Sequence, residues 1–510
     1  MTNAATGTGA QLLLSPVEIR GVMAGLMLAI LLGALDQTIV SVALPRMSSD
    51  LSGLDQLAWV VSGYLVAVAV STPIYGKLGD LYGRRIVLSA AIVIFILTSV
   101  ACALASSMEM LVIARVLQGL GGGGLISVAT TTVADVVAPR ERGRYQAYIS
   151  GAYALANVSG PIIGGLLTEH LSWRWIFWIN LPLGLLALWI CRRVLARLPV
   201  PTGRRGHIDF PGAVLLAAGL SAILVALARI GQGLHDAGEI LPLFAFGALL
   251  LAAYVWLERR TAEPLVPLRI FRYPAVTICC ALLFIIFFEL VSLTVLVPMR
   301  VQMASGARVD LAALHLLPLT LAMPIGSLGG GWWMSRTGRY KPVQLLGAAM
   351  VPFALALLAF IDAGMPILGH CLLGLGGLGL GIQIPAVMAV VQNAVPREHL
   401  GVVTAASSFF RAFGAAVGTA VLTALLLAAL SDALPAGALA GGEFLSETLH
   451  AAAAGMDAAG RGSLKAIVYG AYREIFLAGA LVALVSVGLG LRLQNGTLGG
   501  ASGATPGARP

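Results

Sequence analysis

Apolar runs of about 20 residues recur along almost the whole chain, and they restrict its fold more than any other feature. As a helix, each run is long enough to cross about 30 Å of hydrocarbon. The runs lie near residues 21–44, 57–76, 86–105, 109–134, 145–168, 174–191, 211–229, 240–257, 274–297, 311–334, 343–361, 367–391, 402–430 and 467–491. The sequence therefore predicts an all-α polytopic membrane protein with fourteen transmembrane helices.

The composition agrees with a membrane protein, because 58% of the residues are hydrophobic and only 11% are charged. A soluble domain of 510 residues would need a more strongly charged surface. Residues 1–20 contain no basic cluster, and the run 21–44 is longer than the core of a signal peptide. We therefore expect this first run to be retained as a membrane span.

The net charge of +9 is explained by topology. An even number of spans places both termini on one side of the membrane. Most Lys and Arg residues outside the spans fall in the loops of that side, which the positive-inside rule assigns to the cytoplasm. We expect cytoplasmic termini and no nucleic-acid partner.

The cysteines indicate neither a disulfide framework nor a metal site. All five fall inside predicted spans or at their ends, and no Cys/His spacing is typical of metal ligands. We expect no metal and no cofactor.

A charged loop occurs twice, 255 residues apart. The first copy, Gly76–Arg85, reads GKLGDLYGRR, and the second, Gly331–Tyr340, reads GWWMSRTGRY. A loop repeated once in each half of a membrane protein predicts a transporter built from two similar bundles. Ser335 stands where the first copy has Asp80, so we expect no matching acid-dependent contact in the second half.

The repeat and the linkers divide the chain. We expect a cytoplasmic segment at 1–20 and an N-terminal six-helix bundle at 21–195. Basic, proline-rich linkers with two inserted helices follow at 196–273. We expect a C-terminal six-helix bundle at 274–492, which includes an outer loop at 431–465, and a disordered cytoplasmic tail at 493–510.

Four ionisable residues lie well inside the apolar runs, namely Asp36, Arg115, Glu289 and Arg411. A charge in the bilayer costs at least about 2.5–3.5 kcal/mol, so a functional role is the first hypothesis. At 1.5 Å per residue, the first three lie about 9–12 Å from the outer ends of their spans. They can therefore face one shared cavity in the outer half, whereas Arg411 lies nearer the midplane.

Asp36 and Arg115 form either a fixed structural ion pair or a proton site. Desolvation favours a neutral acid and an adjacent guanidinium favours the carboxylate, so opening a cavity changes the proton affinity. Glu289 is a second candidate, either for protonation or for attracting a cationic substrate. Its structural alternative is a neutral acid hydrogen-bonded to a neighbouring helix.

Further motifs accompany the first loop. They are LDQTIVSVALP at 35–45, RVLQG at 115–119, GPIIGG at 160–165, and WRWIF at 173–177 followed by INLP at 179–182. The loop matches the general form G-x-L-x-D-x-x-G-R-R of the major facilitator superfamily. The combination, between about residues 29 and 413, resembles the fourteen-span drug:proton antiporter branch, which contains multidrug and quaternary ammonium efflux transporters. The resemblance implies two six-helix bundles plus two inserted helices.

The resemblance also implies roles for particular residues. Asp36 would take part in proton coupling and Arg115 in proton transfer. A cytoplasmic gate, which latches the two halves when the cavity faces outward, would consist of Gly76, Asp80, Gly83, Arg84 and Asp135. An antiporter motif, whose small residues let one helix press on another, would consist of Gly160, Pro161, Gly164 and Gly165.

Aromatic, flexible and polar side chains inside the spans are candidates for a substrate cavity. The alternative for the aromatic residues is contact with lipid or other helices, and for the polar residues it is hydrogen bonding between helices. The candidates are Gln37, Tyr64, Gln118, Asn157, Phe284, Phe288, Met323, Gln383, Phe409 and Arg411.

These features predict a bacterial cell-membrane transporter that exchanges lipophilic, cationic compounds for protons by alternating access and functions as a monomer. Its partners would be small-molecule substrates, protons and the bilayer, with any envelope partner protein left open. The alternative is an exporter of the same fold for one metabolite, siderophore or lipid. An enzyme is disfavoured because the sequence offers no cluster of catalytic acids, histidines or metal ligands.

Overall fold

The computed structural model describes residues 16–51, 57–137, 141–197, 209–231, 237–261, 264, 268–305, 309–361, 365–396, 400–433 and 458–494. All the secondary-structure elements within these ranges are helices, which confirms the predicted all-α fold. Nearly all of the predicted tail 493–510, most of the predicted outer loop 431–465 and residues 1–15 of the predicted N-terminal segment lie outside the described residues.

The first half of the chain forms helices that follow the first six apolar runs. They are α1 (Pro16–Leu51), α2 (Leu57–Tyr82), α3 (Arg84–Ala103), α4 (Met108–Val136), α5 (Arg142–His170), α6 (Trp175–Trp178) and α7 (Asn180–Val194), with the 3-10 helix η2 (Leu195–Arg197) after them. The sixth run is divided into α6 and α7. Pro182 has no N–H to donate to the carbonyl of Trp178, so the helix is interrupted there.

The remaining runs also form helices. They are α8 (Phe210–Gly231), α9 (Ala237–Glu258), α10 (Pro274–Ser305), α12 (Leu317–Thr337), α13 (Lys341–Leu358), α14 (Pro366–Asn393), α15 (Leu400–Ala433) and α17 (Ala458–Arg492), with short helices η3 (Leu268–Arg272) and α11 (Val309–Leu314). α17 begins earlier than expected and includes the end of the predicted outer loop.

Ten helices in the described ranges are long and apolar enough to cross a membrane. α8 and α15 contain shorter apolar stretches, and α5 and α12 are not among the ten. α5 and α12 pack against each other across the two halves of the molecule. The count of fourteen spans stays a prediction.

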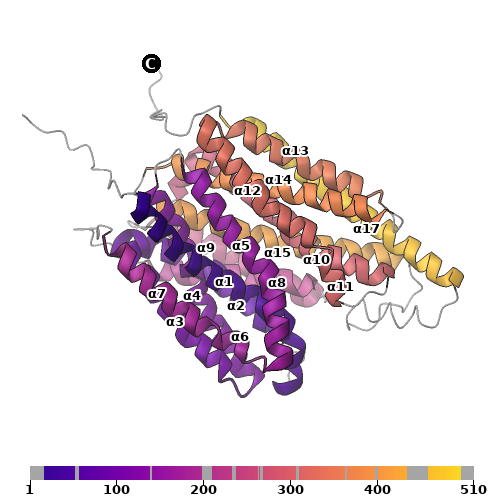
Figure 1. Cartoon of the computed structure of the whole chain (residues 1–510), viewed down its shortest axis with the longest axis horizontal. Coiled ribbons are helices and arrows are strands. Elements are labelled where there is room, and N and C mark those ends of the chain that lie inside the picture. The colour runs from indigo at the N-terminus through magenta and orange to yellow at the C-terminus, as the bar shows by residue number, and fades with distance from the viewer. Residues whose placement is uncertain are drawn as a thin grey trace, which may run out of the picture.

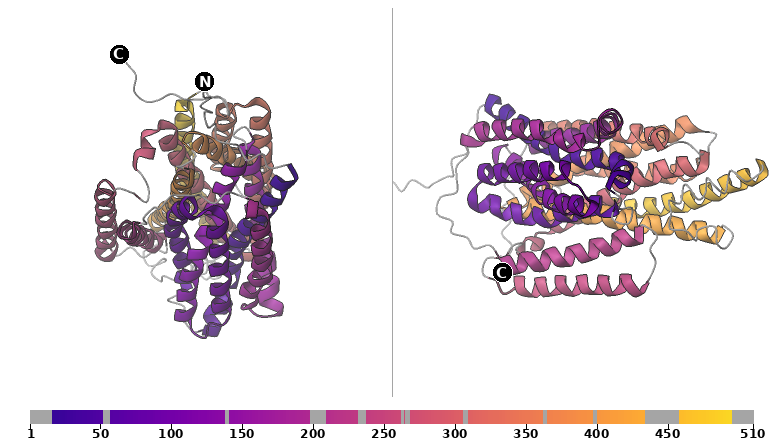
Figure 2. Two further views of the ribbon diagram at one scale, coloured as in Figure 1. Left: turned by 90° about the vertical axis from the view of Figure 1, so that its left-hand side faces the viewer. Right: turned by 90° about the horizontal axis from the view of Figure 1, so that it is seen from below.

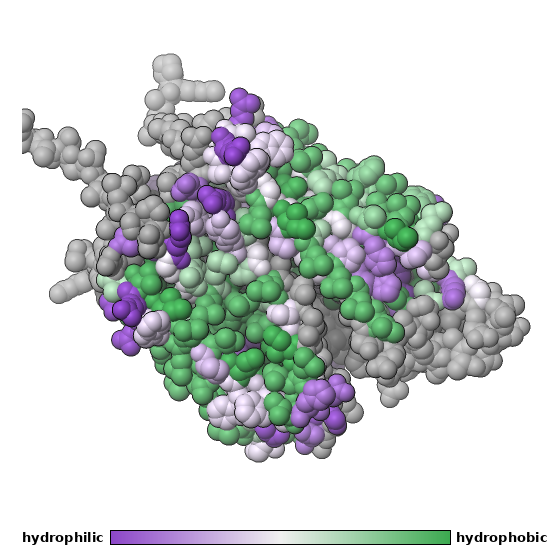
Figure 3. Space-filling model, viewed as in Figure 1, coloured by the Kyte–Doolittle hydropathy of each residue, from purple (hydrophilic) through white to green (hydrophobic). Residues whose placement is uncertain are grey.

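The helices form two bundles that lie side by side (Figure 1). Buried side chains of α1–α7 form core clusters of their own, and those of α10–α17 form another. Across the boundary, α2 contacts α15 and α5 contacts α12. The bundles diverge toward the ends marked by α6 and by the start of α17 (Figure 1), and a space-filling view is hollowed between them on that side (Figure 3).

α8 and α9 form a separate layer beside the bundles (Figure 2). α8 contacts α2 of one bundle and α15 of the other, and Val70, Leu216 and Phe409 belong to the apolar contact between these three helices. The apolar side chains of α9 are largely exposed, as expected for a helix that faces lipid.

Candidate functional site

A fully buried ion pair joins α1 to α4 in the N-terminal bundle. Arg115 Nη1 donates a hydrogen bond to Asp36 Oδ2 at 2.5 Å, and each residue is 1% exposed. Arg115 Nε also donates to the carbonyl of Val60 on α2 at 3.2 Å, and its guanidinium lies 4.2 Å from the ring centroid of Tyr64. The guanidinium of α4 is therefore held by contacts with α1 and α2.

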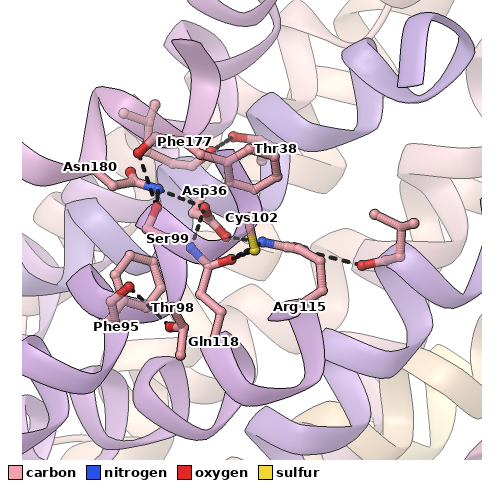
Figure 4. A network of polar contacts seen from close by, with 12 residues as sticks. Asp36, Thr38, Phe95, Thr98, Ser99, Cys102, Arg115, Gln118, Phe177 and Asn180 are labelled. Carbon is pink, nitrogen blue, oxygen red and sulfur yellow. Dashed lines mark hydrogen bonds and ion pairs between the residues drawn. The ribbon is translucent and has the colours of Figure 1, made fainter. Parts of the chain in front are cut away.

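Two amides complete the environment of the Asp36 carboxylate (Figure 4). Gln118 Nε2 donates to Asp36 Oδ1 at 3.1 Å, and Asn180 Nδ2 donates to the same oxygen at 2.8 Å. Arg115 Nη1 also donates to Gln118 Oε1 at 2.7 Å, and Asn180 Nδ2 contacts Ser99 Oγ at 3.0 Å. Asp36 thus accepts hydrogen bonds from three side chains, which stabilise a buried carboxylate.

The network contains residues that the sequence did not single out. Asn180 and Ser99 had no predicted role, although Asn180 lies in the INLP motif, whose polar residue within an apolar run was the available signal. Gln118 and Tyr64 were expected as cavity candidates. Both are at most 1% exposed and belong to this network. In this structure they therefore make contacts between helices, which was the alternative to lining a cavity.

Glu289 lies in the other bundle, on α10, and is 1% exposed. Its Oε2 lies next to Gly479 of α17, where an added Cβ would be 3.2 Å away, and Leu355 of α13 closes the same space. Oε1 has no hydrogen-bond partner among the described residues. The expectation that Asp36, Arg115 and Glu289 face one shared cavity is wrong, because each carboxylate is buried inside its own bundle.

Arg411 of α15 lies between the two bundles. Its guanidinium is 4.4 Å from the ring centroid of Phe287 on α10 and 5.6 Å from that of Tyr153 on α5. Arg411 is half-buried, unlike the other three intramembrane charges. Through its contacts with Phe287 and Tyr153, Arg411 touches both bundles, whereas the contacts described above for Asp36, Arg115 and Glu289 lie within one bundle.

Most of the remaining cavity candidates pack between helices. Gln344 Nε2 donates to Gln383 Oε1 at 3.0 Å within the C-terminal bundle, and Phe288 and Met323 are also buried there. The rings of Phe284 and Phe409 each lie 5.7 Å from that of Phe413. Gln37 is half-buried, and the side chain of Asn157 lies outside the described part of the chain.

The glycines of the predicted antiporter motif bring α5 onto α1. A Cβ at Gly160 would lie 2.7 Å from Thr38 Cβ, and one at Gly164 would lie 3.0 Å from the Ile39 carbonyl oxygen. Thr38 Oγ1 donates to the carbonyl of Ala156 at 3.1 Å across the same contact. A Cβ at Gly165 would meet nothing within 4 Å, and the side chain of Pro161 is not described.

The first charged loop brings four of the five predicted gate residues together. Arg84 Nε donates to Asp135 Oδ2 at 2.8 Å, and Arg84 Nη2 pairs with Asp80 Oδ1. The Gly76 carbonyl accepts a longer bond of 3.5 Å from Arg84 Nη1. Gly83, between α2 and α3, has a φ of 86°, a positive value that glycine adopts more readily than other residues.

This loop also contacts the opposite bundle. A Cβ at Gly401, the second residue of α15, would lie 2.6 Å from Asp80 Cγ, so the carboxylate lies at the helix N-terminus, where the backbone dipole favours a negative charge. We call Asp80, Arg84, Asp135 and the start of α15 the latch. In the second copy, Ser335 Oγ donates to the carbonyl of Trp332 in its own helix.

The described residues contain no group of three or more His, Cys, Asp or Glu side chains that could hold a metal ion. The five cysteines are free thiols.

The sequence of this chain is similar to those of known proteins. A model of the Major Facilitator Superfamily matches residues 26–419. An uncharacterized MFS-type transporter of Mycobacterium tuberculosis is 36% identical over 408 residues, which are 79% of this chain and 59% of that relative. The multidrug transporter protein MdtP of Bacillus subtilis is 32% identical over 393 residues, 76% of this chain and 72% of the relative. The efflux pump dotC of Dothistroma septosporum is 34% identical over 399 residues, 76% of this chain and 68% of the relative.

Solved structures share the fold at low identity. The human organic anion transporter MFSD10 (TETRAN) superimposes with a TM-score of 0.60 at 18% identity, covering 92% of this chain and 100% of that one. The proton:xylose symporter XylE gives a TM-score of 0.58 at 16% identity, covering 92% and 96%. At these identities the likeness extends to the fold alone.

Proposed function

Because this chain belongs to the Major Facilitator Superfamily, whose members are membrane transporters, we propose that it is a proton-coupled antiporter. It exports lipophilic, cationic compounds across the cell membrane by alternating access, with both termini in the cytoplasm. The names of two relatives, a multidrug transporter and an efflux pump, support export of diverse compounds. The transport cycle needs no bound cofactor, because the proton gradient drives it.

The observation that carries the proposal is the buried pair of Asp36 and Arg115. A carboxylate enclosed by α1, α4 and α7 cannot bind a proton without losing its ion pair to Arg115. Protonation from the outer side therefore leaves an uncompensated guanidinium, whose nearest remaining acceptors are Gln118 Oε1 and the Val60 carbonyl. Since these groups belong to α4 and α2, protonation changes the contacts between the helices that must move.

The latch supplies the second state of the cycle. In this structure Asp80, which pairs with Arg84 and through it with Asp135, lies against the start of α15 at one end, and the bundles diverge at the other. Export requires the latch to open while the diverging end closes. Proton binding at Asp36 and substrate release then belong to the arrangement seen here, and proton release and substrate uptake belong to the opposite one.

A second candidate function is supported by Arg411. This guanidinium lies between the bundles, where it would repel a cation close to it and attract an anionic one. An exporter of the same fold for a specific metabolite, siderophore or lipid with a negative group accounts for this residue directly.

Inverted membrane vesicles test the proposal. Vesicles acidified inside should release protons when ethidium is added to wild type, and Asp36→Asn should abolish this release while inserting normally. Glu109→Gln neutralises an exposed acid on α4 and serves as the matched control. Proton release on adding an anionic siderophore, with none for ethidium, would select the second candidate. Undiminished release in Asp36→Asn would remove Asp36 from proton coupling.

A further inference from the structure

Glu289 occupies the place in the second bundle that Asp36 occupies in the first. The two loops repeat at an interval of 255 residues, and Glu289 follows Asp36 by 253. The glycine contact repeats at a similar interval. Gly164 contacts Ile39 beside Asp36, and Gly418 contacts Phe288 and Ser292 on either side of Glu289. α10 and α15 therefore repeat the packing of α1 and α5, and each crossing carries one buried carboxyl group.

The surroundings of the two carboxyl groups differ. Asp36 has the Arg115 guanidinium and the Asn180 amide as donors. Glu289 instead has Leu355 on α13 and the bare backbone of Gly479 on α17. Among the described residues, no ion pair includes Glu289, and its Oε1 has no hydrogen-bond partner, whereas Asp36 pairs with Arg115. Asp36 thus has a cation in contact with its carboxylate, and Glu289 has none among the described residues.

This difference separates the two groups chemically. An ionised carboxylate buried without a partner is strongly disfavoured relative to the neutral acid. Burial without a cation therefore favours the neutral form of the Glu289 carboxyl group, whereas the Arg115 guanidinium offsets a charge on the Asp36 carboxylate. Because they share no cation and lie in different bundles, binding at one site does not exclude binding at the other.

Building on the proposed antiport, we propose that Glu289 is a second proton-binding site, so that two protons enter for each molecule exported. Gly479 is a positioning residue, because its missing side chain lets α17 cover the carboxyl group without displacing it. The stoichiometry fixes the charge balance. Two protons moving inward against one monovalent cation moving outward transfer one net positive charge inward per cycle, so the exchange responds to membrane potential as well as to the pH gradient.

Purified protein in liposomes tests the stoichiometry with ethidium as the probe. In wild type, a potassium diffusion potential at equal pH should drive exchange above the background of Asp36→Asn liposomes. In Glu289→Gln the exchange becomes one proton for one cation, so it should respond to a pH gradient and lose its response to potential. Glu289→Asp, which keeps an acid, should retain the response to potential.

The outcomes separate this inference from the antiport itself. Exchange in wild type that follows the pH gradient and ignores potential would overturn the role of Glu289 and leave antiport intact. Retained response to potential in Glu289→Gln would do the same. Absence of any proton-linked ethidium movement in wild type would overturn the antiport proposal and this inference with it.

Two glycines of α17 test whether Gly479 positions the Glu289 carboxyl group. Gly479→Ala places a methyl group 3.2 Å from Glu289 Oε2, so the carboxyl group must move and the pH profile of potential-driven exchange should shift. Gly470→Ala makes the same change on the same helix with nothing within 4 Å and should keep the wild-type profile. Identical profiles for the two variants would contradict the positioning role of Gly479.

Discussion

At the scale of single residues, the donors to the Asp36 carboxylate come from two other helices. Arg115 and Gln118 lie on α4 and Asn180 on α7, while Asp36 itself lies on α1. A hydrogen bond to a charged group contributes about 1.5–3 kcal/mol, and 1.36 kcal/mol corresponds to a tenfold change in proton affinity. Removal of one neutral donor should therefore change the proton affinity of the Asp36 carboxylate and leave its ion pair with Arg115 in place.

Asn180→Ala removes one donor from the Asp36 carboxylate and should raise its proton affinity about tenfold or more. Because proton release into the cytoplasm becomes harder, ethidium export should reach its half-maximal rate at a more alkaline cytoplasmic pH. Initial export rates across a pH series measure the shift. Ser99→Ala is the control, since it removes the other partner of Asn180 and leaves all three donors to Asp36 in place. A profile in Asn180→Ala that matches wild type would show that the amide does not set this equilibrium.

At the scale of helices, the apolar runs predicted where the helices lie in the sequence, but they did not predict which side of each helix faces its neighbours. The runs near 21–44 and 274–297 became α1 and α10, yet nothing in them shows which neighbour Asp36 or Glu289 faces. Nearly every face of such a helix is apolar, so periodicity does not distinguish the buried side from the lipid side. The loop Gly76–Arg85 was more informative, because its charges near a helix end allow few partners, and Arg84 bonds Asp135, which was predicted to belong to the same gate. Asn180 was missed because its partner lies 144 residues away.

Close contact between α1 and α5 depends on Gly160. Gly160→Ala places a Cβ 2.7 Å from Thr38 Cβ, and such overpacking costs about 1–3 kcal/mol. We expect a lower thermal unfolding midpoint in detergent and a faster proton leak in liposomes, because the helices must separate. Gly165→Ala lies in the same motif and meets nothing within 4 Å, so it should match wild type in both measurements. Equal midpoints for the two variants would contradict this account of the helix contact.

At the scale of the whole molecule, the two bundles are joined by unequal contacts. Asp80 of the latch lies against the start of α15, and Gln392 Nε2 donates a bond of 3.4 Å to the Thr130 carbonyl between α14 and α4. α8 lies against α2 and α15, one helix from each bundle, so rocking of the bundles must slide both helices along it. The apolar nature of that contact permits sliding, whereas the contact of Asp80 with the start of α15 must break when the bundles separate at that end.

Asp80→Asn should therefore shift the balance between the two arrangements of the whole molecule. The change removes the charge that pairs with Arg84 and lies at the start of α15, and a charge-assisted contact of about 1.5–3 kcal/mol corresponds to a shift of roughly tenfold or more toward the open latch. Spin labels at two exposed residues, Tyr82 at the end of α2 and Pro396 before the start of α15, report this shift as a longer distance by electron paramagnetic resonance. Ser335→Ala changes the corresponding position of the second loop, whose hydroxyl bonds within its own helix, and should leave the distance distribution unchanged. If both variants keep the wild-type distribution, the closed end is held by apolar packing between α2, α15 and α8, and Asp80 serves the fold of the loop alone.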